Sequence, residues 1–179
     1  MKIGVAGVGG IGSNVAVNLV RSGVRGFTIA DFDTVDASNL NRQFYFKDQI
    51  GKPKVDMLKE NLLRINPVLD IRVIAGHLTE DTITNSFADC DLIVEGFDSS
   101  EDKKMLLEAF SGDSRLVVSA SGIAGSSVDN ISSRRFGNCR IVGDFITDCK
   151  EAPLYAHKVL TVAAFMTDII LTECGLYER

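Results

Sequence analysis

A glycine-rich turn near the start of the chain constrains the fold more than any other feature of the sequence. Residues 3–6 form a short continuous apolar run, typical of a strand that is buried on both faces of a sheet. Residues 11–20 carry apolar side chains at helical spacing. The turn between these segments contains the glycines Gly7, Gly9, Gly10 and Gly12. A glycine cluster between a strand and a helix is the context that a nucleotide-binding turn requires.

The glycines of this turn have separate expected roles. Gly7 allows the tight turn, and Gly9 or Gly10 lets the backbone approach a ligand. Gly12 lets the helix pack close to the strand, and the unpaired N–H groups at the helix start favour an anionic or polar ligand. Asp31 ends the second predicted strand, where a carboxylate accepts hydrogen bonds from ribose hydroxyls. The turn alone is compatible with NAD, FAD or ATP, and the alternative is a turn that serves packing only.

Apolar runs of strand length alternate with helical patterns along most of the chain. We expect strands over residues 3–6, 27–30, 71–74, 92–94, 116–118 and 140–142. We expect helices over residues 11–20, 52–65, 79–87 and 158–172. Pro53 falls in the first turn of its helix, Ser99 opens a further helix with Asp102 in a capping box, and residues 119–133 predict mostly loop. This order predicts an α/β, Rossmann-like fold, a mostly parallel sheet with helices on both faces.

A polar segment after the second predicted strand favours a nucleotide that carries a triphosphate. Arg42 and Lys54 bring two cations towards the phosphates, and Asn39 and Gln43 add uncharged donors. A triphosphate that loses pyrophosphate needs such groups to stabilise the developing negative charge. Asp98, just past the fourth predicted strand, is placed to hold Mg²⁺ against the phosphates. Taken singly, these residues also suit a surface lysine, a loop salt bridge and a helix cap.

The combination of these motifs resembles the ThiF/MoeB family, relatives of the ubiquitin-activating enzymes. The resemblance runs in chain order from Met1 to about Gly125 and rests on Gly7-x-Gly9-Gly10-x-Gly12-Ser13, Asp31-x-Asp33, Ser38-Asn39-Leu40-Asn41-Arg42-Gln43, Pro53-Lys54 and Phe97-Asp98. The short, cysteine-poor form and the Gly-Asp-Phe run at residues 143–145 look most like the compact ThiF proteins of bacterial thiamine biosynthesis.

This resemblance implies ATP-dependent adenylylation of the C-terminal glycine of a small ubiquitin-like sulfur carrier, ThiS, which ends in Gly-Gly. By position it assigns Gly10 and Asp31 to the nucleoside and Asp98 to Mg²⁺. It assigns the phosphates to Asn39, Arg42 and Lys54. The carrier's own carboxylate attacks the α-phosphorus, so no Ser-His or Cys-His pair is required, and catalysis falls to Arg42, Lys54 and Asp98 by positioning and charge stabilisation. Family members are usually dimers, so we expect a homodimer.

The sequence departs from the family pattern in three places. Larger members carry two C-x-x-C pairs for structural zinc; the cysteines here form no such pair, so we expect no zinc. Many members begin with a helix that supplies an arginine to the partner subunit's ATP, whereas this chain begins at the strand. Residues 156–159 read Ala-His-Lys-Val where compact relatives often read Ala-Pro-Arg-Val. Cys149, next to Lys150, is the candidate for a covalent link to the carrier, with an inert thiol as the alternative.

Length and composition limit the class of protein. A chain of 179 residues suits one domain, and we expect residues 1–179 to form a single ThiF-type domain. The formal net charge of −5 argues against nucleic acid as a partner. No signal peptide opens the sequence and residues 159–171 are too few to span a bilayer, so we expect a cytoplasmic protein without membrane contact. The predicted helix over residues 158–172 is apolar round most of its circumference, which suits core or a subunit interface.

Two other functions stay open on the sequence alone. A NAD- or FAD-dependent oxidoreductase uses the same glycine turn, but it leaves Arg42, Lys54 and the polar loop without a role. A non-catalytic relative would bind a carrier or a nucleotide as a scaffold, and the missing leading helix is compatible with that function.

Overall fold

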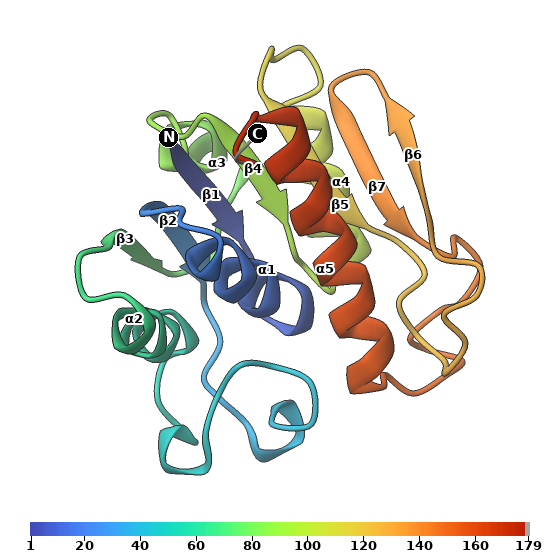
Figure 1. Ribbon diagram of the computed structural model, residues 1–179, viewed down its shortest axis with the longest axis horizontal. Helices are drawn as coiled ribbons and strands as arrows, with labels where there is room; N and C mark the ends of the chain where they lie inside the picture. Colours follow the sequence, from blue (N-terminus) through green and yellow to red (C-terminus); the bar gives the residue numbers. More distant parts are fainter. Residues whose placement is uncertain (178–179) are drawn as a thin grey trace.

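A single mixed sheet organises the protein (Figure 1). The computed structural model describes residues 1–177, and these form a seven-stranded sheet with the order β3-β2-β1-β4-β5-β7-β6. All neighbouring strands are parallel except β6 and β7, which are antiparallel. The strands are β1 (Lys2–Ala6), β2 (Gly26–Asp31), β3 (Asp70–Ala75), β4 (Leu92–Glu95), β5 (Leu116–Ala120), β6 (Ser132–Phe136) and β7 (Cys139–Gly143). The Rossmann-like fold that the sequence predicts is confirmed.

Helices cover both faces of the sheet. Helices α1, α2 and α5 pack on one face, and α3 and α4 pack on the other (Figure 1). The helices are α1 (Gly10–Arg21), α2 (Lys54–Ile65), α3 (Glu80–Ser86), α4 (Ser100–Ala109) and α5 (Ala156–Glu173), with 3₁₀ turns at Ala37–Asn39 and Lys47–Gln49. Within the described residues, no helix combines the length and the apolar character that crossing a membrane requires.

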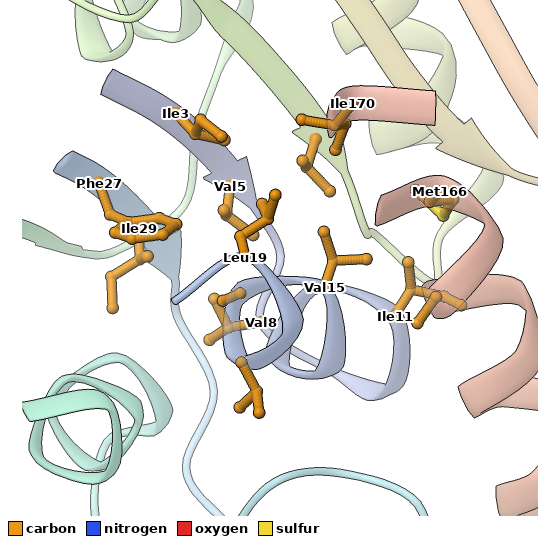
Figure 2. Close-up of a cluster of buried hydrophobic side chains, with 14 of the residues drawn as sticks. Ile3, Val5, Val8, Ile11, Val15, Leu19, Phe27, Ile29, Met166 and Ile170 are labelled. Atoms are coloured by element: carbon orange, nitrogen blue, oxygen red, sulfur yellow. The ribbon is translucent and has the colours of Figure 1, made fainter. Parts of the chain in front are cut away.

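Strand β1 shows how side-chain alternation separates the two cores. Ile3 and Val5 belong to the cluster that packs with α1 and α5, drawn in Figure 2. Gly4 faces the opposite side, where a Cβ atom would lie 2.6 Å from the ring of Phe87. Phe87 is fully buried, so it packs directly on the β1 backbone, and only glycine leaves room for it.

Two helix starts differ from the prediction. Pro53 lies outside α2 as its N-cap residue, because the helix begins at Lys54. Ser99 caps α4 as predicted, and its hydroxyl accepts hydrogen bonds from the amides of Glu101 and Asp102 at 3.2 and 3.3 Å. The return bond from the Asp102 carboxylate to Ser99 is absent among the described residues, so the predicted capping box is only half formed.

Strand β6 is an element that the sequence prediction missed. The loop predicted over residues 119–133 is wrong at both ends, because β5 continues to Ala120 and β6 begins at Ser132. Strand β6 lies at the edge of the sheet, pairs with β7 alone and is largely exposed. An exposed edge strand carries no continuous apolar run, so it lacks the signal by which buried parallel strands are recognised.

Helix α5 runs alongside α1 on the same face of the sheet (Figure 1). Its buried side chains, including Val159, Val162, Met166 and Ile170, pack into the main core. Leu160 points outward and is 45% exposed. The core role expected for this helix is therefore confirmed for one face, and the subunit interface stays a prediction.

The strand order places a binding edge next to β1. The chain runs outward from β1 through β2 to β3 and then returns to β4 on the other side of β1. The carboxyl ends of these parallel strands meet at one edge, and neighbouring loops diverge where the order reverses. Ligands of open α/β sheets bind in the crevice that this reversal opens.

Candidate nucleotide-binding site

A pocket opens at this edge, and most of the residues singled out from the sequence line it. Its walls come from the ends of β1, β2, β3 and β4, the loop before α2 and the start of α5. The predicted site residues among its lining are Gly7, Gly9, Gly10, Asp31, Arg42, Gln43, Lys54 and Asp98. Gly12 and Asn39 are not part of this lining.

The glycine turn is packed on one side and open on the other. Gly7 has φ +83°, and a Cβ atom on it would lie 2.7 Å from the backbone of Gly96. A Cβ atom on Gly12 would lie 1.9 Å from the Gly7 carbonyl oxygen, so Gly12 packs against the backbone of the turn. At Gly9 the nearest atom is Nε2 of Gln43, 3.7 Å from such a Cβ. Gly7 and Gly12 therefore serve close packing, and the backbone is approachable at Gly9.

Asp31 orders the turn and also faces the pocket. Its Oδ2 accepts a hydrogen bond from the Val8 amide at 2.7 Å, and its Oδ1 accepts one from the Asp33 amide at 2.8 Å. Each carboxylate oxygen retains a second lone pair, so Asp31 can also accept bonds from hydroxyl groups of a ligand.

The two predicted cations lie in the pocket wall. Lys54 is buried, only 5% exposed, and its Nζ lies 2.7 Å from Oδ2 of Asp33. The alternative of a surface lysine is therefore wrong. Arg42 donates through Nη1 to the Ser38 carbonyl oxygen at 3.0 Å and to Oδ1 of Asn41 at 2.8 Å. Its other guanidinium donors have no acceptor in the described part of the chain.

Asn39 caps its own turn through its side-chain oxygen, and its contact with phosphate stays a prediction. Its Oδ1 accepts a hydrogen bond from the Asp36 amide at 2.9 Å, while the Asp36 carboxylate accepts one from the Ser38 amide. These reciprocal bonds cap the 3₁₀ turn that precedes Arg42. Gln43 does line the pocket, and its buried Oε1 has no hydrogen-bond partner among residues 1–177.

Behind Asp98 lies a buried carboxylate that the sequence analysis missed. Glu95, the last residue of β4, is fully buried and accepts hydrogen bonds from the Phe97 amide at 2.8 Å and the Ser119 hydroxyl at 2.5 Å. It also pairs with Lys103 of α4. These contacts fix the segment that carries Asp98. An acidic residue at the end of an apolar strand gave no signal of such a network.

The pocket wall beside α5 is apolar and contains Ile123, Leu154 and Val159. A buried ion pair lies next to this wall. Lys158 is 1% exposed, and its Nζ lies 2.6 Å from Oδ2 of Asp144. Burial acts to raise the pKa of Asp144, but the hydrogen bonds from Lys158 and from nearby amides outweigh it and hold that pKa well below the usual range.

The rim of the pocket carries two further residues that the sequence analysis did not single out. The rings of Phe32 and His77 stack with centroids 3.5 Å apart, next to Asp31.

Cys149 is an exposed free thiol outside the pocket lining, so its covalent role stays a prediction. In the described residues, no cluster of three or more His, Cys, Asp or Glu side chains is arranged to hold a metal ion.

Comparison with known proteins defines the class. The profile of the ThiF family matches residues 1–139, and the chain belongs to this family. The molybdopterin-synthase adenylyltransferase of Salmonella typhimurium is 36% identical over 99 residues, which cover 55% of this chain and 40% of that protein. The tRNA threonylcarbamoyladenosine dehydratase of Bacillus subtilis is 40% identical over 86 residues, which cover 48% of this chain and 34% of that protein.

A solved structure supports the fold along nearly the whole chain. The crystal structure of the Escherichia coli tRNA N6-threonylcarbamoyladenosine dehydratase, TcdA, in complex with ATP matches with a TM-score of 0.83 at 19% identity. The match covers 99% of this chain and 88% of that one. Against the curated relatives above, the chain spans only 34 to 40% of their length. The resemblance to the ThiF/MoeB family is thus confirmed, and the fold is shared with a solved relative.

Proposed function

We propose that the protein is an adenylyltransferase that uses ATP to activate the C-terminal glycine of a small ubiquitin-like sulfur carrier of the ThiS type. The observation that carries this proposal is the pocket, which brings the open glycine turn, Asp31, two cations and Asp98 to one edge of the sheet. A redox dinucleotide gives Arg42 and Lys54 no comparable task, so their presence favours nucleotidyl transfer over an oxidoreductase.

The residues present suit ATP and Mg²⁺. Asp31 offers acceptors to the ribose, and the open side of Gly9 and the free donors of Arg42 suit phosphates. Asp98 is exposed at the pocket and makes no hydrogen bond or ion pair with the described residues, as suits a carboxylate that binds a cation. Mg²⁺ is commonly held by one or two carboxylates together with substrate phosphates, and when bound it neutralises charge on them.

The proposed reaction needs no side-chain nucleophile. A carboxylate oxygen of the carrier forms a bond to the α-phosphorus, the bond from that phosphorus to the bridging oxygen breaks, and pyrophosphate leaves with the electron pair. Arg42 and Lys54 stabilise the negative charge that accumulates on the departing phosphates. The carrier carboxylate is already ionised at neutral pH, so no general base is required.

Carrier-dependent exchange of labelled pyrophosphate into ATP tests this function. We expect Asp98→Ala to abolish exchange and Arg42→Ala to slow it by about a hundredfold, the usual effect of removing one charge-stabilising donor. Asp48→Ala and Arg64→Ala are matched controls, because both residues are exposed and lie outside the pocket lining. Absence of exchange with every ubiquitin-like partner from the same genome contradicts the proposal and favours a non-catalytic scaffold.

The similarity to the Bacillus subtilis tRNA threonylcarbamoyladenosine dehydratase favours a second candidate, a dehydratase that acts on a tRNA nucleoside. Exchange stimulated by tRNA and not by a carrier would support this candidate. Calorimetry distinguishes the oxidoreductase from both candidates, because an oxidoreductase must bind NADH more tightly than Mg-ATP. For the first candidate we further propose a role in thiamine biosynthesis in the cytoplasm. We also propose that the chain forms a homodimer, and sedimentation analysis of the purified chain will detect this dimer.

A further inference from the structure

The glycine turn is tied to the loop that carries Arg42 by side chains from both segments. Nδ2 of Asn14 donates to the carbonyl oxygen of Arg42 at 2.8 Å, and the hydroxyl of Ser13 accepts a hydrogen bond from the Phe44 amide at 3.1 Å. The hydroxyl of Tyr45 donates to the carbonyl oxygen of Val8 at 2.7 Å across 37 residues of sequence. The last of these bonds reaches the middle of the turn itself.

Tyr45 is suited to a permanent donor role. Its side chain is buried, and the residue is 5% exposed. Burial raises the pKa of its phenol well above the ordinary value, and the charges of Asp31 and Asp33 add to this effect. The hydroxyl therefore keeps its proton at neutral pH. No part of the reaction proposed above uses this residue.

Hydrogen bonds hold the two successive peptide units that adjoin Val8. Asp31 holds the Gly7–Val8 peptide by accepting a hydrogen bond from the Val8 amide at 2.7 Å, and Tyr45 holds the Val8–Gly9 peptide by donating to the Val8 carbonyl oxygen. In a trans peptide the carbonyl and the next N–H point in opposite directions, so binding the Val8 oxygen directs the Gly9 N–H away from Tyr45. Gly9 lines the pocket, and its amide has no acceptor in the described part of the chain.

Because a glycine follows Val8, the orientation of the Val8–Gly9 peptide needs a hydrogen bond to stabilise it. A peptide that precedes a glycine can rotate at little steric cost, because glycine has no Cβ atom. A rotated Val8–Gly9 peptide would present its carbonyl oxygen where an anionic ligand needs an N–H donor. The hydrogen bond from Tyr45 opposes that rotation, and loss of the bond leaves the buried Val8 oxygen unpaired.

We propose that Tyr45 is a positioning residue of the nucleotide site, which holds the Gly9 amide towards the phosphates of the bound nucleotide. This inference rests on the proposed function. It makes the Val8–Gly9 peptide a fixed donor that is present before the ligand arrives, so that binding costs no rearrangement of the turn.

The experiment compares Tyr45→Phe with Tyr177→Phe. Each variant removes one phenolic hydrogen bond of 2.7 Å, but Tyr177 donates to Asp168 on the exposed surface of α5. We expect the Kd of Mg-ATP, measured by calorimetry, to rise about tenfold in Tyr45→Phe and to stay within about twofold in Tyr177→Phe. In the wild type, ATP should shift the Gly9 amide resonance in ¹⁵N–¹H spectra, and in Tyr45→Phe that shift should shrink.

The possible outcomes distinguish failure of the proposed function from failure of the positioning role. A wild-type chain that binds no nucleotide contradicts both. A wild type that binds ATP together with an unchanged Kd and a lower Tm in Tyr45→Phe overturns the positioning role alone, because Tyr45 would then only stabilise the fold. The wild-type spectrum decides the matter even if the variant fails to fold, since a Gly9 amide that does not respond to ATP overturns the inference.

Discussion

Two buried lysines, one at the start of α2 and one near the start of α5, lie in or beside the pocket wall and differ in their surroundings. Each pairs with an aspartate at nearly the same distance, 2.7 Å for Lys54 with Asp33 and 2.6 Å for Lys158 with Asp144. The Asp33 side chain is 43% exposed, whereas that of Asp144 is 9% exposed. Lys54 lines the pocket and Lys158 does not. Similar ion pairs are thus open to the pocket in the case of Lys54 and enclosed by protein in the case of Lys158.

The enclosed pair also joins two loops. Besides Asp144, Lys158 binds the Ala124 carbonyl oxygen at 2.5 Å and the Thr147 hydroxyl at 3.3 Å. The loops that follow β5 and β7 are thereby fixed to the first turn of α5. Burial of a lysine therefore does not by itself identify a ligand-binding cation. The exposure of the aspartate partner distinguishes Lys54 from Lys158. A charge that loses its partner costs most where water cannot replace it.

The largest effect is expected at the enclosed pair. Lys158→Ala leaves the Asp144 carboxylate buried without its cation, so we expect a loss of about 3 to 5 kcal/mol in the free energy of unfolding. Chemical denaturation measures this value. Lys104→Ala is the control, because Lys104 pairs with Glu108 on the exposed surface of α4 and should contribute less than about 1 kcal/mol. Equal effects of the two substitutions would show that enclosure of the Lys158–Asp144 pair adds nothing to stability.

Lys54→Ala is expected to affect activity more than stability. Its partner Asp33 can be hydrated when the lysine is removed, so unfolding should lose less free energy than in Lys158→Ala. Pyrophosphate exchange should fall by about a hundredfold, as for other charge-stabilising groups. Exchange and denaturation measured on the same preparations check both parts. A stability loss as large as that of Lys158→Ala would show that both pairs are structural.

The smallest of these effects is a dependence of stability on acid. The pKa of Asp144 is lowered in the folded protein from an ordinary value of 3.8, so its ionised form stabilises the fold above that pH. Stability from this group should therefore decrease as the pH falls below about 4, and the decrease continues towards the lowered folded value. Unfolding measured between pH 3 and pH 7 should show a shallower decrease in Lys158→Met, where the main cause of the lowered pKa is gone. An unchanged slope would assign the acid sensitivity to other carboxylates.

Much of the fold and of the site follows from local patterns in the sequence. Buried parallel strands are short apolar runs, and the glycine turn is a short motif that is recognised from neighbouring residues. Arg42, Lys54 and Asp98 follow the same logic, because the carboxyl ends of parallel strands gather at one edge. These residues were predicted and do lie together in the pocket.

The remaining parts depend on contacts that no local pattern encodes. The bond from Tyr45 to Val8 spans 37 residues, and Ser119 reaches Glu95 across 24. Asn39 also caps its own turn through Oδ1, a short-range contact that the family likeness does not reveal. Polar residues have several possible partners, and only the tertiary arrangement selects among them.

The interior position of β1 has a consequence for the order in which the protein assembles. Strand β1 is synthesised well before its second neighbour, β4, which ends at Glu95. Gly7 packs against Gly96, so the turn lacks this contact until β4 has been synthesised. Pairings between segments so far apart form slowly. The glycine turn therefore takes its final form only after β1 pairs with β4, and ATP added during refolding would report that this pairing has formed.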